Sequence, residues 1–440
     1  MDPVHIIGAG VSGLGAAHYL AARGIPSVIH EVGSHVGGRA ACIQQGEHAF
    51  EIGGKNFSSA WPRFNALLQE FGITEFEDQH PGFHIVMNNA LVALEKSKTL
   101  TGDLRLASAL GPRGALQFRN FLSYARQNAD RLNYTSGLIE QVEKRWDHAT
   151  IDKHFTKRLN EGPLRLFSII MGGAEPSELY PSLMMLFASG FGKGSHHAIA
   201  GGIGQFHDNL AKGKTIRFGS KVRQILTYEG HVSGLMLEEK TGPRMIPASR
   251  VISAVPAHVL RQMTDLPAYG RVALDQLRYF PLAMVNVVYD APVFKDGVHS
   301  IMFEPGAPLG HCSANRLHSP HHVRYTLSGK AARNILDRSD VDLVQIAEET
   351  FSKRLPIKAG RLRVHVARHP GGICGYAPYF TTVKKDILRA AESISGLEIA
   401  GDFLEGHTME GCLTSADLAV QRLLAPAQRR GVPVQRWAAE

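Results

Sequence analysis

The sequence predicts an α/β protein of two domains. The N-terminal part alternates strand and helix, as in a parallel sheet, and the other part combines a sheet with a mostly helical insertion. Three observations carry this prediction. A buried strand, Val4–Ile7, runs through a glycine-rich turn into an Ala/Leu-rich helix. Residues 105–200 instead carry apolar residues at helical spacing, and strand patterns return after residue 200.

The N-terminal stretch alternates strand and helix. Gly24 is expected to end the first helix as its C′ residue. Ser27–His30 then reads as the second strand, with Glu31 at its tip. The segment 50–54 reads as a strand that enters another glycine turn, and Pro62 begins a helix at the position that proline tolerates best.

After residue 200 the pattern is mixed. Glu229-Gly230 is expected to join two strands as a hairpin. We expect helices at residues 340–354 and 410–424, and strands at residues 215–218, 222–228, 232–237, 251–256, 281–289, 322–327, 362–367 and 397–400. The paired histidines 196–197 and 321–322 are expected in surface loops.

Composition excludes several classes of protein. With 440 residues, 44% hydrophobic and 20% charged, the chain is globular and neither disordered, collagen-like nor a coiled-coil rod. Its net charge of +8 includes no run of five like charges, so nucleic-acid binding has little support. The chain shows no signal-peptide pattern, and its longest apolar neighbourhood, residues 179–191, is too short to span a membrane.

The cysteines and histidines argue against further kinds of site. The four cysteines have no C-x-x-C spacing, which argues against a disulfide framework or a zinc site and suits a reducing compartment. The 22 histidines show no metal-ligand spacing with a matching second pair. We therefore expect a cytoplasmic protein without a metal centre that acts on a small molecule, and a homo-oligomer is compatible with the sequence.

The glycine turn carries the first chemical signal. Gly8-x-Gly10-x-x-Gly13 follows a strand, opens a helix through Val11 and Ser12, and has an acid, Glu31, 23 residues after Gly8. This context is the one that a dinucleotide-binding fingerprint requires. The glycines allow a tight turn, close approach to a pyrophosphate and helix–strand packing, while the acid accepts hydrogen bonds from the adenosine ribose.

A second glycine turn follows at once, as Gly37-Gly38-Arg39. It suits a cofactor with two phosphates and a ribityl chain, whose charge backbone amides and an arginine share. With these residues the chain resembles the FAD-dependent amine oxidase and protoporphyrinogen oxidase superfamily. The resemblance implies a Rossmann-type FAD-binding domain from residues 1–80, 200–270 and 385–440. It assigns residues 81–199 and 271–384 to a substrate-binding domain with a helical insertion.

Three later stretches extend the resemblance. Glu51-Ile52-Gly53-Gly54 is similar to the turn whose backbone lies beside the isoalloxazine ring. Residues 201–204 and 221–225 are similar to the returning segment, in which the Val222 backbone meets the adenine. The C-terminal motif implies contacts to the ribityl chain or phosphate and, from a helix N-terminus, to flavin N1 and O2; its residues are Gly401, Asp402, Met409, Glu410, Gly411 and Cys412.

The resemblance also suggests residues near the reaction. Many amine oxidases of this superfamily carry a lysine that contacts flavin N5 through water, and the alignment puts Met284 there, nearer to the protoporphyrinogen oxidase and desaturase branches. Tyr376 and Tyr379 are candidates for an aromatic wall over the flavin, or for an ordinary core or surface role. Lys55 either anchors a substrate carboxylate or holds a flavin oxygen. Cys374 loosely resembles a site of covalent flavin attachment, but non-covalent FAD is favoured.

The expected reaction is removal of a hydride from a C–H bond next to nitrogen, giving an imine, with O2 or another acceptor reoxidising the flavin. The flavin carries such chemistry, so few catalytic side chains are needed. Two alternatives stay open. The first is a C–C desaturase or a protoporphyrinogen-oxidase-like dehydrogenase, and the second is a non-redox flavin isomerase or a flavin-bearing binding subunit.

Overall fold

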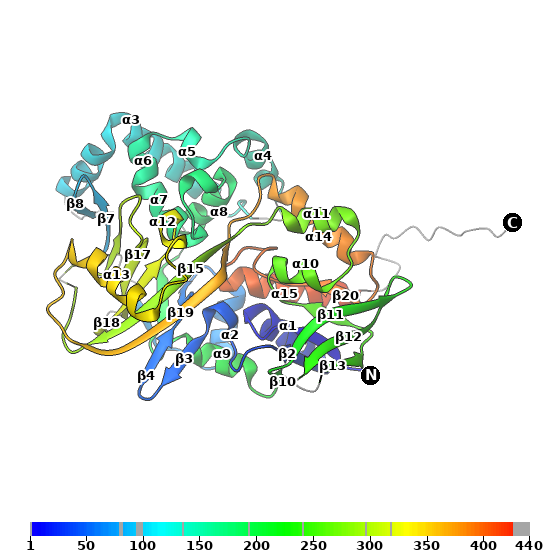
Figure 1. The fold of residues 1–440 in the computed structure, drawn as a ribbon. Helices are drawn as coiled ribbons and strands as arrows, with labels where there is room; N and C mark the ends of the chain where they lie inside the picture. Colours follow the sequence, from blue (N-terminus) through cyan, green and yellow to red (C-terminus); the bar gives the residue numbers. More distant parts are fainter. Residues whose placement is uncertain are drawn as a thin grey trace. The chain divides into compact units, whose positions relative to one another are not determined.

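The chain folds into two compact units in the computed structural model (Figure 1). The first contains residues 1–38, 207–276 and 382–440, and the second contains residues 39–206 and 277–381. The structure describes residues 2–78, 82–93, 100–133, 136–191, 194–239, 242–294, 297–316 and 319–425. Residues 39–80, expected with the first unit, pack in the second. Unit boundaries reflect packing alone, so the assignment of binding roles to domains stays a prediction.

A five-stranded parallel sheet forms the centre of the first unit. Its strand order is β10-β2-β1-β14-β20, with bounds Thr215–Phe218, Ser27–Glu31, Val4–Ile7, Val251–Ser253 and Leu397–Ile399. Two helices, α1 (Val11–Ala21) and α15 (Met409–Leu424), pack on each other closely enough that a Cβ on Gly15 would meet Leu413 at 2.9 Å. The predicted α/β fold class is confirmed, because strand β1 lies in the middle of a sheet whose order reverses beside it.

The rest of the first unit contains the predicted hairpin together with a strand and two helices that were not predicted. Strands β11 (Lys221–Tyr228) and β12 (His231–Glu239) form the predicted hairpin, and its turn residues Glu229 and Gly230 both have positive φ. A third strand, β13 (Gly242–Pro247), was not predicted. Helices α10 (Ala257–Met263) and α11 (Ala268–Asp275) complete this part of the unit.

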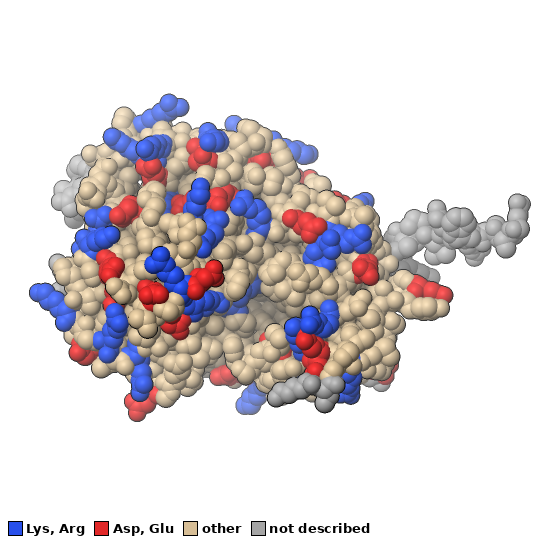
Figure 2. All heavy atoms as spheres, in the orientation of Figure 1, with Lys and Arg blue, Asp and Glu red and all other residues tan. Residues whose placement is uncertain are grey.

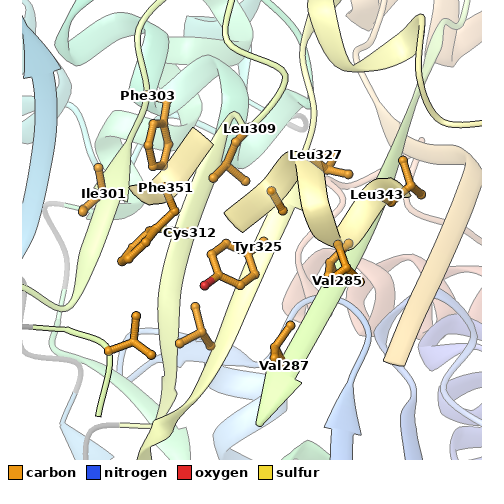
Figure 3. Packing of buried hydrophobic residues seen from close by; sticks show 14 of the residues in the cluster. Val285, Val287, Ile301, Phe303, Leu309, Cys312, Tyr325, Leu327, Leu343 and Phe351 are labelled. Atoms are coloured by element: carbon orange, nitrogen blue, oxygen red, sulfur yellow. The ribbon is translucent and has the colours of Figure 1, made fainter. Parts of the chain in front are cut away.

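A seven-stranded mixed sheet forms the frame of the second unit. Its order is β19-β15-β18-β17-β16-β7-β8, with bounds Arg361–Cys374, Tyr279–Tyr289, Ser319–Leu327, His311–Arg316, Ser300–Met302, Phe83–Met87 and Ala90–Ala93. One face is apolar and is covered by α13 (Asp340–Ser352) (Figure 3). The buried residues of this core include Val285, Val287, Val323, Tyr325, Leu327, Leu343 and Phe351.

Residues of a strand point alternately to the two faces of a sheet. The opposite face of this sheet therefore carries the residues that alternate with the apolar core, among them the buried polar residues Asn286, His322 and Arg324. Residues 50–55 lie against it; they begin in strand β4 (His48–Glu51), which forms a hairpin with β3 (Cys42–Gln45). The Phe50 ring contacts the rings of His322 and His365, with centroids 5.4 and 5.3 Å away. The expectation that residues 321–322 form a surface loop was therefore wrong, since both lie in strand β18 and His322 is buried.

The predicted helical insertion is present in the second unit. Its helices are α3 (Leu100–Gln127), α4 (Gly137–Trp146), α5 (Ile151–His154), α6 (Lys157–Glu161), α7 (Pro163–Phe167) and α8 (Pro181–Phe191), with a π-helical turn at Ser168–Gly172 and a 3-10 turn at Pro176–Glu178. Gly111, with φ of 71°, and Pro112 interrupt α3. Among the described helices, none combines the length and apolarity needed to cross a membrane.

A small sheet and several short helices complete the chain. The sheet has the order β5-β9-β6, with bounds Asn56–Ser58, His196–Ile199 and Phe76–Asp78. Strand β9 contains His196 and His197, so the expected surface loop at this pair was wrong as well. The remaining helices are α2 (Pro62–Glu70), α9 (Ile203–Ala211), α12 (Lys330–Arg333) and α14 (Phe380–Glu392), together with a 3-10 turn at Gly38–Ala40.

Candidate functional site

The carboxyl ends of the parallel strands bring most of the expected cofactor-binding residues together in the first unit. Gly8 follows β1, Glu31 ends β2, and Gly401-Asp402 follow β20. The Ala400 N–H donates to the carbonyl of Ser253, at the end of β14, over 2.9 Å. This edge is where open α/β sheets bind their ligands.

The first glycine turn is shaped by close backbone approach. Gly8 has φ of +100°, a conformation that favours glycine. A Cβ on Gly13 would lie 1.9 Å from the Gly8 carbonyl oxygen, so helix α1 can pack on the turn only with glycine there. Gly10 is the N-cap of α1, so no side chain caps this helix, and a Cβ built on Gly10 meets no atom within 4 Å. The helix N-terminus at Val11 and Ser12 therefore fits an anionic group.

The Glu31 carboxylate is held in place by two backbone donors. Oε2 accepts the N–H of Ala9 and Oε1 accepts the N–H of Gly33, each at 2.7 Å. The Glu31 carbonyl accepts the N–H of Ser220 at 2.9 Å, two residues before Val222. A carboxylate offers about four acceptor positions, so Glu31 orders the glycine turn and keeps capacity for hydroxyl donors.

The second glycine turn packs on the first. The Gly37 N–H donates to the Ala9 carbonyl at 2.9 Å. A Cβ on Gly38, which has φ of +56°, would lie 3.2 Å from the Gly10 Cα atom. The two turns of the fingerprint therefore form one backbone structure.

The C-terminal motif forms the start of helix α15. The Thr408 hydroxyl caps the helix by accepting the N–H of Gly411 at 3.0 Å. A Cβ on Gly411 would lie 2.2 Å from the Gly406 carbonyl oxygen, so glycine is required there. The Gly401 N–H donates to the Ser415 hydroxyl at 2.9 Å. Within this motif, Asp402 and Met409 are buried, whereas Glu410 and Cys412 are partly exposed.

The flavin-side glycines expected from the sequence differ in their surroundings. A Cβ on Gly53 would lie 1.8 Å from the Arg39 carbonyl oxygen, so Gly53 is required by packing in the second unit. Gly54 is exposed, and a built Cβ meets nothing within 4 Å. The Arg39 guanidinium donates to the Gly372 carbonyl at 3.0 Å and lies over the Tyr279 ring.

Lys55 is buried, with 5% of its side chain exposed. Its ammonium donates to Asn315 Oδ1 at 3.3 Å and lies 3.8 Å from Glu51 Oε2. The Glu51 carboxylate, also buried, accepts the N–H of Ile203 at 2.9 Å. The lysine is therefore one member of a buried ion pair rather than an exposed cation.

Arg324, on β18, is a site residue that the sequence did not single out. Its Nη2 donates to the Gly53 carbonyl at 2.6 Å and lies 3.5 Å from Met284 Sδ, while Nε has no hydrogen-bond partner in the described part of the chain. Burial lowers the pKa of the guanidinium, and the Glu51 carboxylate opposes this effect. Met284, 7% exposed, therefore has a buried cation beside it from the neighbouring strand.

The two candidate tyrosines lie in one segment but in different settings. Tyr376 and Tyr379 both have positive φ, 56° and 53°, which is uncommon for bulky residues. Tyr376 is 3% exposed and meets the Phe380 ring edge-on, whereas Tyr379 is 40% exposed. Cys374, just before them, has no exposed surface.

Charge and metal-ligand chemistry indicate no second site among the described residues. On the face drawn in Figure 2, Lys and Arg side chains are interspersed with Asp and Glu. Across the described ranges no group of three or more His, Cys, Asp or Glu side chains is arranged to hold a metal ion.

Comparison with known proteins identifies a family whose sequence model matches this chain. A model of the family described as flavin containing amine oxidoreductase matches residues 11–424. The fold is similar to that of wild-type putrescine oxidase bound to putrescine, with a TM-score of 0.74 and 16% identity over 96% of this chain and 99% of that one. It is also similar to cyclohexylamine oxidase from Brevibacterium oxydans IH-35A, with a TM-score of 0.72 and 15% identity over 96% and 98%. At such identities the likeness shows the fold alone.

One curated relative is similar over a short stretch. It is protoporphyrinogen oxidase 2, chloroplastic/mitochondrial, from Arabidopsis thaliana, 33% identical over 94 residues. The matched stretch is 21% of this chain and covers 18% of the length of that relative.

Proposed function

Because the chain belongs to the flavin containing amine oxidoreductase family and is thus an FAD-dependent oxidoreductase, we propose that it oxidises a CH–NH bond of a small amine or amino-acid-derived substrate to an imine. FAD, when bound, accepts two electrons and one proton from that bond as a hydride equivalent, and O2 or another acceptor then removes the electrons. The second proton leaves from the substrate nitrogen. The observation that carries the proposal is the family match over residues 11–424, which includes Glu31, the second glycine turn and the C-terminal motif.

The first unit supplies most of the proposed FAD contacts. The uncapped start of α1 and the open space at Gly10 support a pyrophosphate position at that turn. Glu31, fixed by two backbone donors, would accept hydrogen bonds from the ribose. The proposed FAD-binding residues are Gly8, Gly10, Val11, Ser12, Gly13, Glu31, Gly38, Arg39, Gly53, Gly54, Val222, Gly401, Asp402, Met409, Glu410, Gly411 and Cys412.

We propose that FAD is bound without a covalent link. Cys374, the thiol considered for attachment, has no exposed surface, and a sulfur atom must be reachable to bond a flavin. Acid precipitation should therefore release free FAD from the yellow protein. Flavin that stays with the denatured pellet would favour a covalent link instead.

Buried charge in the second unit supports oxidation of a neutral amine. Lys55 and Arg324 carry two positive charges against one carboxylate, Glu51. Positive charge disfavours a nearby ammonium, and the neutral amine is the form from which a hydride leaves. Tyr379 is exposed enough to touch a substrate, whereas Tyr376 and Met284 are buried and would shape the site from behind.

The test is anaerobic flavin bleaching by a panel of amines, amino acids and porphyrinogens. The proposal predicts bleaching by an amine or amino acid and a product two mass units lighter that hydrolyses to a carbonyl compound. A panel in which no compound bleaches the flavin would favour a non-redox isomerase or a flavin-bearing binding subunit.

A C–C desaturase or protoporphyrinogen-oxidase-like dehydrogenase is the second candidate. Two observations favour it: the 33% identity to protoporphyrinogen oxidase 2 over 94 residues, and Met284 at the position considered for a lysine. Bleaching by a porphyrinogen, with a new C–C double bond and no carbonyl product after hydrolysis, would identify this reaction. A homo-oligomeric state and a cytoplasmic location stay predictions.

A further inference from the structure

We propose that Arg324 is a positioning residue. From β18 it holds the Gly53 carbonyl and thereby presents the Gly54 backbone N–H as a fixed hydrogen-bond donor to an acceptor atom of the flavin. The inference rests on the proposed function, in which the turn at residues 53–54 faces FAD. It adds a specific donor to that function, together with the side chain that orients this donor.

Arg324 is committed to the turn by its contacts. Its Nη2 donates to the Gly53 oxygen at 2.6 Å, while 7% of the side chain is exposed. Among the described residues Arg324 forms no ion pair, and its Nε has no hydrogen-bond partner. Burying a guanidinium in this way is costly, so a structural role alone explains it poorly.

Another buried arginine of the same unit shows the contrast. Arg165, 1% exposed, donates to both carboxylate oxygens of Glu175, at 2.7 and 2.9 Å, and also to the Phe303 carbonyl. Its charge is neutralised and its role is structural. The two arginines share burial and a bond to a backbone carbonyl, but only Arg165 has a carboxylate in contact.

The geometry of the peptide gives the consequence. In a planar trans peptide the C=O and the following N–H point in opposite directions. The Gly54 N–H is therefore directed away from Arg324, and within the described residues no acceptor binds it. Gly54 is exposed, with open space around it. A cation on the carbonyl polarises the peptide and makes its N–H a stronger donor.

The test compares holoenzyme variants that remove or retain the bond. Arg324→Met removes the charge and the donor, Arg324→Gln retains a neutral donor, and Arg165→Met is the matched control. The readouts are the dissociation constant for FAD, the midpoint potential of the bound flavin and the melting temperature of the apoprotein.

We expect Arg324→Met to weaken FAD binding by about tenfold to a hundredfold, the equivalent of one hydrogen bond to a charged group. The flavin potential should become more negative, because the Gly54 N–H becomes a weaker donor to the reduced flavin once the charge on the Gly53 carbonyl is lost. Arg324→Gln should recover part of the affinity. Arg165→Met should lower the melting temperature and leave the potential at the wild-type value.

Three outcomes decide the matter. A wild-type protein that binds no FAD contradicts the proposed function itself. Wild-type affinity and potential in the Arg324 variants would overturn the inference alone, as would equal potential shifts in Arg165→Met. If Arg324→Met fails to fold, Arg324→Gln and an Arg324→Lys variant carry the comparison, since wild-type potentials in both would overturn the inference.

Discussion

The Asp147 carboxylate accepts a hydrogen bond from the Ser182 hydroxyl at 2.6 Å within the helical insertion. It also accepts the N–H of Ser182 at 3.0 Å and that of Tyr379 at 3.4 Å. Glu143, one turn earlier on α4, accepts the N–H and the hydroxyl of Thr381. Burial raises the pKa of both carboxyl groups, and their hydrogen bonds oppose this effect. Two buried carboxyls thus hold the segment that carries Tyr379.

Asp147→Ala should destabilise the protein strongly. It leaves the two Ser182 donors buried without an acceptor and removes the partly buried bond from the Tyr379 N–H. Each buried donor without a partner costs about 1–3 kcal/mol. We expect the free energy of unfolding to fall by at least about 3 kcal/mol, measured by urea denaturation. The control is Asp152→Ala, because Asp152 is partly exposed and its ion pair with Lys153 is of the kind worth about 1 kcal/mol or less. Equal losses in the two variants would contradict this role.

The local features of the site could be predicted from the sequence because short-range physics determines them. The glycine turn needs positive φ and close approach at Gly8 and Gly13, and Glu31 ends the strand that follows. The hairpin turn at Glu229-Gly230 follows from the same conformational preference. These features involve residues that are near one another in sequence.

The buried polar face could not be predicted in this way. Alternation in the sequence around Arg324 indicates a strand with two faces, but a polar face is usually exposed. Arg324 is buried because residues 50–55 cross the sheet there, about 270 positions earlier in the chain. The expected surface loop at residues 321–322 was wrong for the same reason, whereas the strand expected from residue 322 is present. Only the tertiary packing of Phe50 and Gly53 reveals that this face is covered.

Glu31→Ala should weaken both FAD binding and the apoprotein. We expect a loss of about 1.5–3 kcal/mol in FAD affinity, the value of a hydrogen bond to a charged group. The melting temperature of the apoprotein should also fall, because the N–H groups of Ala9 and Gly33 lose their acceptor. Any FMN affinity should change less, since FMN lacks the adenosine ribose. Equal losses for FAD and FMN would make Glu31 purely structural.

Alanine at Gly53 and alanine at Gly54 should give opposite results. In Gly53→Ala the new Cβ would lie 1.8 Å from the Arg39 carbonyl oxygen, so backbone must move. Such overpacking costs about 1–3 kcal/mol or more. Gly54→Ala has open space and no positive φ, so the melting temperature of the apoprotein should be unchanged. Similar melting temperatures for the two variants would contradict the geometry of this turn.

His30 should make the first unit sensitive to acid. Its ring nitrogens lie 3.0 Å from His5 Nδ1 and 2.9 Å from the Ser220 hydroxyl. Burial, followed by the positive charges of His5 and Arg217, lowers the pKa of His30 from 6.5 to about 4. The folded state therefore favours the neutral ring. The contribution of the neutral His30 ring to stability is complete above about pH 6.5 and is lost as the pH falls to about 4.

The His30→Gln variant isolates this effect from that of the other histidines. Between pH 7 and pH 4 the wild type should lose up to about 3 kcal/mol more unfolding free energy than the variant. Urea denaturation at several pH values measures the difference. Parallel pH profiles would show that protonation of His30 is not coupled to unfolding.

Lys55→Met separates the two roles considered for this lysine. A lysine that pairs with a substrate carboxylate contributes equally to ground-state and transition-state binding, so KM would rise with kcat little changed. If Lys55 instead stabilises the reduced flavin, its removal would lower both kcat and the flavin potential. The ammonium is buried between Asn315 and Glu51, and we therefore expect the second result.

Stability must be measured alongside the kinetics of Lys55→Met. Removing one member of a buried ion pair costs about 3–5 kcal/mol, because the other charge stays buried. The Lys55→Met/Glu51→Gln double variant should recover part of this loss in stability, since it removes both charges. The flavin potential of the double variant separates the effect of the lost charge from the effect of altered packing. If the double variant recovers stability while kcat and the potential stay low, the ammonium acts on the flavin electrostatically. A rise in KM alone would assign Lys55 to the substrate, and unchanged kinetics and potential would exclude both roles.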